Sequence, residues 1–175
     1  MITEMSTKMQ PSNNYARIAY ATSMSGGIAL ALLSTFIPLY KGIVSIFAVI
    51  FIVFAIALYT KYVVVTYYYD ITTDNRGIPI FVVRQVMGKR ESTLCRIDLA
   101  DIIKVENETA KERRAHKTPF EYRKYSYLPT LMPKNTVRLT VHGKYENAEI
   151  IIENENYGEL LKKYAEEARQ TDFRD

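Results

Sequence analysis

The sequence predicts a membrane-anchored α+β protein, in which a two-helix transmembrane hairpin precedes a bent antiparallel β-sheet or partial barrel capped by a C-terminal α-helix. Three observations lead to this fold class. Two long uncharged apolar stretches lie near the N-terminus, segments of alternating polarity follow them, and an amphipathic segment of helical period ends the chain. The 175 residues carry 23 basic and 19 acidic side chains, a net charge of +4. A single cysteine excludes an internal disulfide bond.

The two apolar stretches are predicted to cross a membrane. Residues 18–40 and 42–60 contain no charged side chain, and about 20 helical residues span the roughly 30 Å hydrocarbon core of a bilayer. The second stretch is richer in Ile, Val, Phe and Leu than the first. The connection around Pro38 and Lys41 is too short for a domain, so residues 15–62 form a hairpin. Residues 1–14 are polar and are expected to form a flexible cytoplasmic tail.

Basic residues near the spans predict the orientation of the hairpin. One of them, Lys41, lies at the tip, and four lie beside the terminal ends. The four are Lys8, Arg17, Lys61 and Arg76. The excess of positive charge predicts a multi-pass protein of the plasma membrane with both termini in the cytoplasm. The triplet at residues 29–31 resembles a signal-peptide cleavage site, but more apolar residues follow it, so cleavage is not expected.

Small residues recur at every fourth position of the first span. They are Ala19, Ser23, Gly27, Ala31 and Thr35. Small side chains let two helix backbones approach closely in lipid. The stripe either closes the hairpin against small residues of the second span (Ser45, Ala48 and Ala55) or binds a second copy or a partner helix. Neither span contains Asp, Glu, Lys, Arg or His, which disfavours an ion pathway or a transporter.

The residues after the hairpin change to the period of β-strands. Residues 63–73 and 78–86 are rich in β-branched and aromatic side chains and flank turn-forming residues at 74–77, which predicts a β-hairpin. Further strands are expected at 91–97 and 102–106, on either side of a short step.

The end of the chain predicts a second strand pair and a helix. Residues 136–142 alternate strictly and turn into residues 148–153, as in an antiparallel pair. Residues 156–169 carry apolar side chains at helical spacing, with Asn156 and Glu159 placed to form a capping box. The apolar face of this helix is expected to cover the sheet, and residues 170–175 are expected to form a tail.

Four runs of residues carry a resemblance to a known family. They are Tyr69–Thr72, Gly77–Ile80, Gly88–Thr93 and Ile97–Glu106. Through them, residues 66–169 resemble bacterial pleckstrin-homology-like (PH-like) domains that follow membrane helices. The resemblance implies a seven-stranded bent sheet capped by a C-terminal helix, which serves binding or assembly and not catalysis. The chain departs from eukaryotic phosphoinositide-binding members, because Arg76 stands without a Lys and Arg cluster and the closing helix has no Trp.

A basic segment interrupts the strand pattern between residues 110 and 133 and is predicted to be a loop. Residues 111–124 hold six basic and two acidic side chains. The basic residues are Lys111, Arg113, Arg114, Lys117, Arg123 and Lys124. They are predicted to bind anionic lipid headgroups or an acidic protein partner, with interfacial contacts from Phe120, Tyr122, Tyr125 and Tyr127. The alternative is a solvated loop whose aromatic side chains pack onto the sheet. The soluble part is not basic enough to predict a nucleic-acid partner.

No catalytic constellation is apparent in the sequence. Cys95 lies in an alternating segment and is expected to belong to the core, and neither His116 nor His142 has an evident partner. Their spacing matches no zinc signature, so no enzyme, no cofactor and no metal site are predicted.

The sequence thus predicts a non-catalytic integral membrane protein that presents a PH-like binding or assembly module at the inner membrane face. The alternative is a structural subunit of a membrane complex, or a homo-oligomer, assembled through the transmembrane hairpin.

Overall fold

The computed structural model describes residues 5–9, 14–144, 146–153 and 155–172. The chain divides into two compact units. One unit is the segment 11–65, and the other combines residues 1–10 with residues 66–175. We describe the two units separately and call them the hairpin and the domain.

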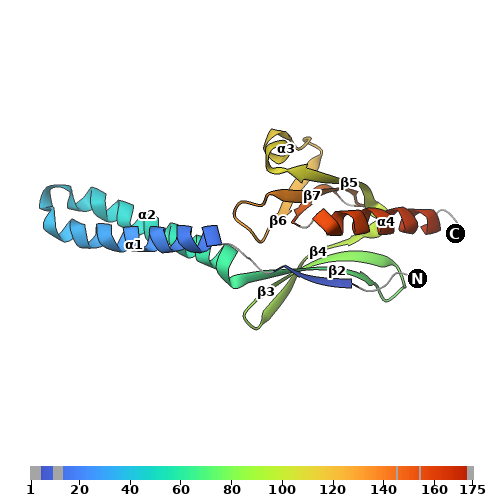
Figure 1. Cartoon of the computed structure of the whole chain (residues 1–175), viewed down its shortest axis with the longest axis horizontal. Helices are drawn as coiled ribbons and strands as arrows, with labels where there is room; N and C mark the ends of the chain where they lie inside the picture. Colours follow the sequence, from blue (N-terminus) through green and yellow to red (C-terminus); the bar gives the residue numbers. More distant parts are fainter. Residues whose placement is uncertain (1–4, 10–13, 145, 154, 173–175) are drawn as a thin grey trace. The chain divides into compact units, whose positions relative to one another are not determined.

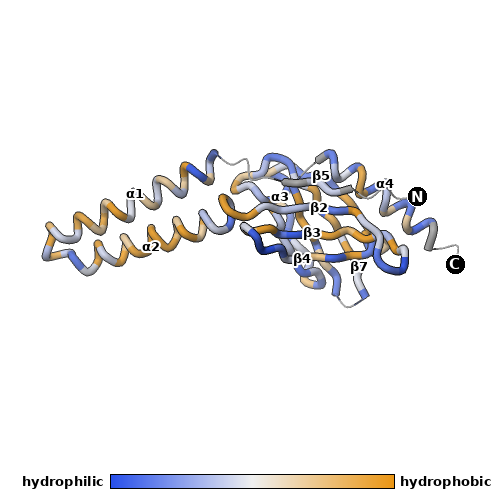
Figure 2. Tube along the Cα trace, turned by 90° about the horizontal axis from the view of Figure 1, so that it is seen from below, coloured by the Kyte–Doolittle hydropathy of each residue, from blue (hydrophilic) through white to orange (hydrophobic). Residues whose placement is uncertain are grey.

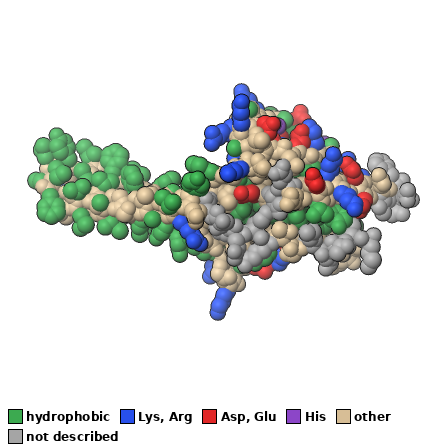
Figure 3. Space-filling model, in the orientation of Figure 1, with side chains coloured by type: hydrophobic (Ala, Val, Ile, Leu, Met, Phe, Trp, Pro, Cys, Tyr) green, Lys and Arg blue, Asp and Glu red, His purple; other side chains and the backbone are tan. Residues whose placement is uncertain are grey.

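The hairpin consists of two long antiparallel helices (Figure 1). Its elements are α1 (Asn14–Phe36), the 3₁₀ turn η1 (Pro38–Tyr40), α2 (Lys41–Tyr59) and the π-helical turn η2 (Thr60–Val64). Pro38 cannot continue the first helix and begins the turn instead. Both helices are long and apolar enough to cross a membrane. Figure 3 shows hydrophobic side chains covering the visible face of the hairpin.

The first sheet of the domain contains four strands in the order β1-β2-β3-β4. They are β1 (Met5–Met9), β2 (Val65–Thr73), β3 (Pro79–Met87) and β4 (Arg90–Asp98). The predicted β-hairpin is β2 and β3, and Gly77 has the positive φ of 81° that its turn requires. Strand β1 pairs antiparallel with β2, so that Thr7 lies opposite Tyr69.

The second sheet also contains four strands, in the order β5-β7-β8-β6. They are β5 (Ile102–Thr109), β6 (Tyr122–Tyr127), β7 (Asn135–His142) and β8 (Asn147–Ile152). The predicted pairing of residues 136–142 with 148–153 is confirmed as the antiparallel pair β7 and β8. Strand β6 runs parallel to β8.

Three short or terminal helical elements complete the domain. They are η3 (Leu99–Asp101), α3 (Ala110–Ala115) and α4 (Glu155–Asp172). The buried face of α4 includes Tyr157, Leu161, Ala165 and Ala168, as the helical spacing predicts. Gly158 lets α4 approach the second sheet closely, because a Cβ atom at this position would lie 2.8 Å from Val137 Cγ2.

An aromatic cluster joins the first sheet to α4. The rings of Tyr69, Phe81 and Tyr157 lie with centroids 6.1 to 6.4 Å apart. The Tyr157 hydroxyl donates to the Tyr69 carbonyl at 3.1 Å, and the Tyr69 hydroxyl donates to the Tyr127 carbonyl at 2.5 Å. Figure 2 shows the orange hydrophobic positions concentrated along the strands of the domain and in the hairpin. The core therefore lies where α4 and the two sheets meet.

The structure corrects four expectations. The eight described strands form two sheets that do not close into a barrel, and one pair is parallel, so a single antiparallel sheet is wrong. The expected tail at residues 1–14 contains β1, which the free edge of β2 stabilises. The helix begins at Glu155 instead of after Asn156, and it continues past residue 169 to Asp172. The expected loop at 110–133 contains α3 and β6, whose pairing with the distant β8 is not a local property of the sequence.

Candidate functional site

The basic segment, residues 110–133, begins as a capped helical turn. The Thr109 side chain accepts a hydrogen bond from the Glu112 backbone, and Glu112 Oε2 accepts one from the Thr109 backbone at 2.8 Å. This capping box starts α3 directly after β5. The hydrogen bonds from Thr109 lower the pKa of Glu112. Hydrogen bonds between residues three apart in the sequence therefore stabilise the start of the segment.

Two of the six predicted binding residues are engaged within the domain. Arg113 donates to Thr136 Oγ1 at 3.2 Å and to the Pro133 carbonyl at 3.3 Å. Arg123 forms an ion pair with Glu146 at 3.2 Å. These contacts engage both guanidinium groups within the domain, although Arg113 is half-buried and the Arg123 side chain is 76% exposed.

The other four predicted residues have exposed side chains. They are Lys111, Arg114, Lys117 and Lys124. Among the described residues, no acidic side chain forms an ion pair with any of the four. Figure 3 shows basic side chains gathered over α3. We call these four residues the free basic set.

A buried ionic cluster lies beneath the segment and was not predicted from the sequence. Its centre is Arg138 on β7, whose side chain is 1% exposed. Arg138 Nε and Nη2 donate to the two oxygens of Glu108 on β5 at 2.5 and 2.9 Å, and Nη1 donates to Glu149 Oε2 on β8 at 2.5 Å. Bidentate contacts of this kind are among the strongest charge-assisted hydrogen bonds.

The cluster also binds the segment above it. His116 Nε2 lies 2.9 Å from Glu149 Oε1, and Thr118 Oγ1 donates to Glu149 Oε2 at 2.7 Å. Glu149 therefore connects the buried Arg138 to two residues of the segment. The only sequence signal was a charged residue between apolar neighbours in the strictly alternating strand. Alternation alone does not show what covers the face that carries Arg138, and the structure buries this side chain.

The electrostatics of the cluster favour its ionised state. Burial opposes the charge on Arg138, but hydrogen bonds and charge from Glu108 and Glu149 outweigh it and raise the pKa of Arg138. Burial likewise opposes the charge on Glu149, and the contacts from Thr118, His116 and Arg138 outweigh it and lower the pKa of Glu149. The cluster is thus a fixed ionic base under the segment.

The four aromatic residues of the segment differ in exposure. Tyr122, Tyr125 and Tyr127 are half-buried, whereas Phe120 is fully exposed. Tyr125 and Tyr127 stack with ring centroids 6.5 Å apart, and the Tyr125 hydroxyl donates to Glu146 Oε1 at 2.7 Å. The expectation that the aromatic residues act together at an interface therefore fits Phe120 best.

A groove of about 650 Å³ lies between β4 and the β6 and β8 side of the second sheet. Cys95 and the stacked tyrosines line it. Burial raises the pKa of the Cys95 thiol to about 11, partly offset by a hydrogen bond with Tyr127, so this thiol is protonated at neutral pH. His142 is exposed. No group of three His, Cys, Asp or Glu side chains in the described residues is placed to hold a metal ion.

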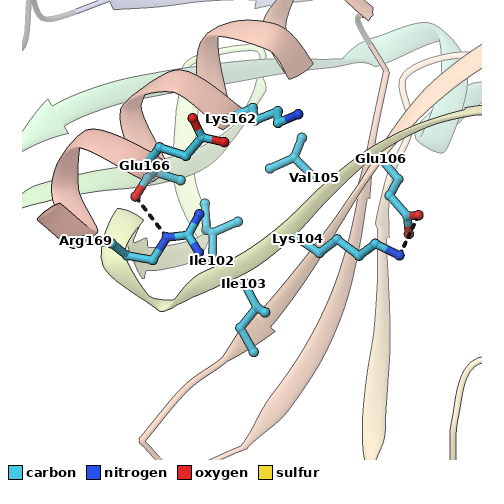
Figure 4. A pocket seen from close by; sticks show the side chains of 9 residues that line it. Ile102, Ile103, Lys104, Val105, Glu106, Lys162, Glu166 and Arg169 are labelled. Carbon is cyan, nitrogen blue, oxygen red and sulfur yellow. Dashed lines mark hydrogen bonds and ion pairs between the residues drawn. The ribbon is translucent and has the colours of Figure 1, made fainter.

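A smaller hollow of about 330 Å³ lies between β5 and α4 (Figure 4). Its lining has mixed charge, with Lys162 and Arg169 beside Glu166 on the helix and Lys104 paired with Glu106 at 2.7 Å on the strand. These charges compensate one another and do not select a ligand of one sign.

The predicted small-residue stripe of the hairpin contributes only its middle to the helix contact. Ser23 and Gly27 are buried, Ala19 is half-buried, and Ala31 and Thr35 are exposed. A spacing of four residues exceeds the 3.6 residues of a helical turn, so the stripe drifts around α1. The buried positions instead follow the 3.6-residue repeat of the helix. They are Ala16, Ser23, Gly27 and Ser34.

Gly27 lies at a close approach between the two helices. A Cβ atom there would lie 2.8 Å from Ile52 Cγ1 and 3.2 Å from the Ala48 carbonyl oxygen. Ala48 and Ala55 are buried on the facing helix, and Ser45 is half-buried. The two central residues of the stripe, Ser23 and Gly27, therefore serve the contact between α1 and α2.

Comparisons with known proteins add no family assignment. The sequence matches no protein-family model, and no curated protein and no solved structure matches it.

Proposed function

We propose that the chain is a non-catalytic integral membrane protein that presents a PH-like binding module to the anionic inner face of the plasma membrane. The hairpin anchors the chain, and the free basic set on α3 and the following segment meets lipid headgroups. One observation carries the proposal. In the part of the chain that the structure describes, four basic side chains are exposed without an acidic partner, on a segment that part-buried hydrogen bonds hold in place.

The order of the elements supports a domain on one side of the membrane. Strand β1 precedes α1, strand β2 follows α2, and the two strands pair directly. A hairpin that crosses twice returns both of its ends to the same side, which this pairing requires. The distribution of basic residues favours the cytoplasm as that side.

The architecture of the domain supports the PH-like assignment. Seven strands follow α2, they form two sheets with the added β1, and a C-terminal helix closes the domain. The resemblance in residues 66–169 implies the same number of strands and the same terminal helix. A module of this kind binds through surface residues and requires no catalytic constellation.

The rigidity of the segment supports lipid binding over simple solvation. The capping box fixes its start, Arg113 binds Thr136, and Glu149 binds Thr118. Ordering these residues on a membrane therefore costs little additional conformational entropy. Basic side chains close to an anionic leaflet are attracted within about one Debye length of its surface.

The test uses the full chain in nanodiscs of phosphatidylcholine, with or without phosphatidylserine, and measures the rate at which an amine reagent labels individual lysines. We expect Lys111, Lys117 and Lys124 to react more slowly in the anionic nanodiscs. The protection should disappear at about 1 M salt, at which the screening length is about 3 Å. Lys89 and Lys162 are exposed elsewhere on the domain and serve as internal controls.

A pair of matched variants completes the test. The double variant K111E/R114E reverses two members of the free basic set, and K89E/R90E makes the same charge change on the exposed turn after β3. Only the first should abolish the protection of Lys117. Equal labelling in neutral and anionic nanodiscs would overturn the lipid assignment. Protection that appears only after an acidic protein is added would also overturn it, in favour of a protein partner.

The alternative function is a structural subunit or homo-oligomer assembled through the hairpin. Its support came from the stripe on α1, whose central residues Ser23 and Gly27 are used within the hairpin. No other observation favours it.

A further inference from the structure

We propose that Phe120 inserts into the headgroup and acyl-chain boundary of the membrane and acts as an apolar anchor for the domain. This inference rests on the proposed function, and it names the residue and the depth of contact. Phe120 is the most exposed large hydrophobic residue of the domain among those described, with its whole side chain in solvent. It lies at the tip of a tight turn, in which the Tyr122 amide donates to the Pro119 carbonyl at 3.0 Å.

The turn has an ordered base. Thr118 precedes it and donates to Glu149, which is itself bound to the buried Arg138 at 2.5 Å. On its other side, the chain enters β6, where Tyr122 lies opposite Asn147 of β8. The domain therefore holds an apolar ring in water at the end of a rigid support, although a loose turn would have let the ring fold back onto the sheet.

The charges around the tip fit a membrane surface. Lys117 and Lys124 flank the turn in sequence, and both are exposed and belong to the free basic set. Arg123 is compensated by Glu146, and Glu121 is exposed at the tip. An apolar side chain between lysines is the arrangement of an interfacial anchor, because the ring enters the acyl boundary as the ammonium groups stay with the headgroups.

The size of the apolar surface favours a bilayer over a protein partner. A stable protein interface buries about 800 Å² on each side and has a cluster of anchoring residues at its centre. Here the neighbouring aromatic side chains are half-buried and make contacts within the domain: Tyr125 binds Glu146, and Tyr127 stacks on Tyr125. One isolated ring is too small for such an interface, whereas a bilayer accepts a single ring without a matching surface.

The experiment exploits the absence of tryptophan from the chain. The variant F120W carries its only tryptophan at the tip, and it is reconstituted as the full chain in nanodiscs of phosphatidylcholine and phosphatidylserine. Lipids brominated near the carbonyl end of their acyl chains quench a tryptophan that lies about 5–10 Å into the interface. We expect a blue shift of the emission and a loss of intensity with the brominated lipids. The variant I103W places tryptophan on the exposed edge strand β5 and should show neither effect.

A second variant measures the contribution of the ring without a probe. F120A should increase the labelling rates of Lys117 and Lys124 in anionic nanodiscs and leave that of Lys89 unchanged. The variant T118A removes a hydrogen bond of the base, and it should decrease the quenching when combined with F120W.

The outcomes separate this inference from the proposed function. If the lysines are protected but the tryptophan of F120W remains unquenched with an unshifted emission, insertion is wrong and the headgroup contact stands. If the lysines are unprotected and the tryptophan is unquenched, both proposals fail. If the quenching is equally strong in neutral nanodiscs, insertion of the ring is supported. The proposed attraction of the basic side chains to anionic headgroups is then wrong.

Discussion

The two faces of the second sheet are covered in opposite ways. On one face, Val137 and Leu139 of β7 belong to the apolar core, and α4 buries Leu161 and Tyr157 in it. On the other face, Arg138 of the same strand forms ionic contacts with Glu108 and Glu149 beneath the segment that leads from α3 to β6. Alternate residues of one strand thus face two kinds of interior.

This difference shows what determines which segment can cover each face of the sheet. The apolar face accepts any helix of matching shape, since hydrophobic burial has no direction. The ionic face accepts only groups that complete its hydrogen bonds, and His116 and Thr118 meet this requirement at 2.9 and 2.7 Å. The ionic cluster therefore fixes the position of the segment that carries the free basic set and Phe120.

The largest expected effect comes from breaking the ionic face. The variant R138M leaves two buried carboxylates without their counter-charge, which typically costs about 3–5 kcal/mol of the free energy of unfolding. The measurement is the midpoint of thermal unfolding of the domain in the full chain, followed by near-ultraviolet circular dichroism of its tyrosines. A triple variant E108L/R138M/E149L should recover most of the loss, because no buried charge remains. A single variant as stable as the parent would show that the cluster is not held together by its charges.

The next largest effect is expected when a buried side chain is removed from the apolar face. The variant L161A removes a side chain of α4 that is 0% exposed and should decrease the free energy of unfolding by about 2–5 kcal/mol. The same unfolding midpoint measures it. The control is L94A at an exposed leucine of β4, which should change the midpoint little. Comparable losses for the two variants would contradict the placement of the core under α4.

A smaller effect tests the close approach of α4 to the sheet. The variant G158A adds a Cβ atom 2.7 Å from Asn107 Oδ1 and 2.8 Å from Val137 Cγ2. Overpacking of this kind typically costs about 1–3 kcal/mol of the free energy of unfolding. The glycine Gly42, around which a Cβ atom would meet nothing within 4 Å, provides the control G42A. A stabilising G158A would mean that the helix shifts outward without loss.

The smallest expected effect is a difference in how the stability contributed by the two faces depends on pH. The pKa of Glu149 lies below its ordinary value of 4.5, so its contribution to stability is complete above that pH and is lost as the pH falls through the lowered value. The difference in unfolding midpoint between the parent and E149Q should therefore shrink as the pH falls below about 4.5. The difference for L161A should not follow this profile. If the difference in unfolding midpoint between the parent and E149Q increased in acidic solution, the ionised Glu149 carboxylate would not be stabilising.

The sequence by itself determined the elements whose signals are local. The uncharged stretches predicted α1 and α2, and the strict alternation of residues 136–142 predicted β7 and its turn into β8. The spacing of apolar residues predicted the buried face of α4. Such patterns follow from the repeat of a helix or strand against an apolar environment, so one segment contains all the information.

Only the tertiary structure decided which distant segments meet. Strand β1 pairs with β2 across the hairpin, β6 runs parallel to β8, and Arg138 meets two glutamates from other strands. Tertiary contacts also distinguish Arg113 and Arg123 from the four residues of the free basic set. Arg113 binds Thr136, and Arg123 pairs with Glu146. The sequence shows that a residue is charged, but it does not show whether that residue faces water or a buried partner. Its role is set by the groups that folding brings within hydrogen-bonding distance, and these lie far away along the chain.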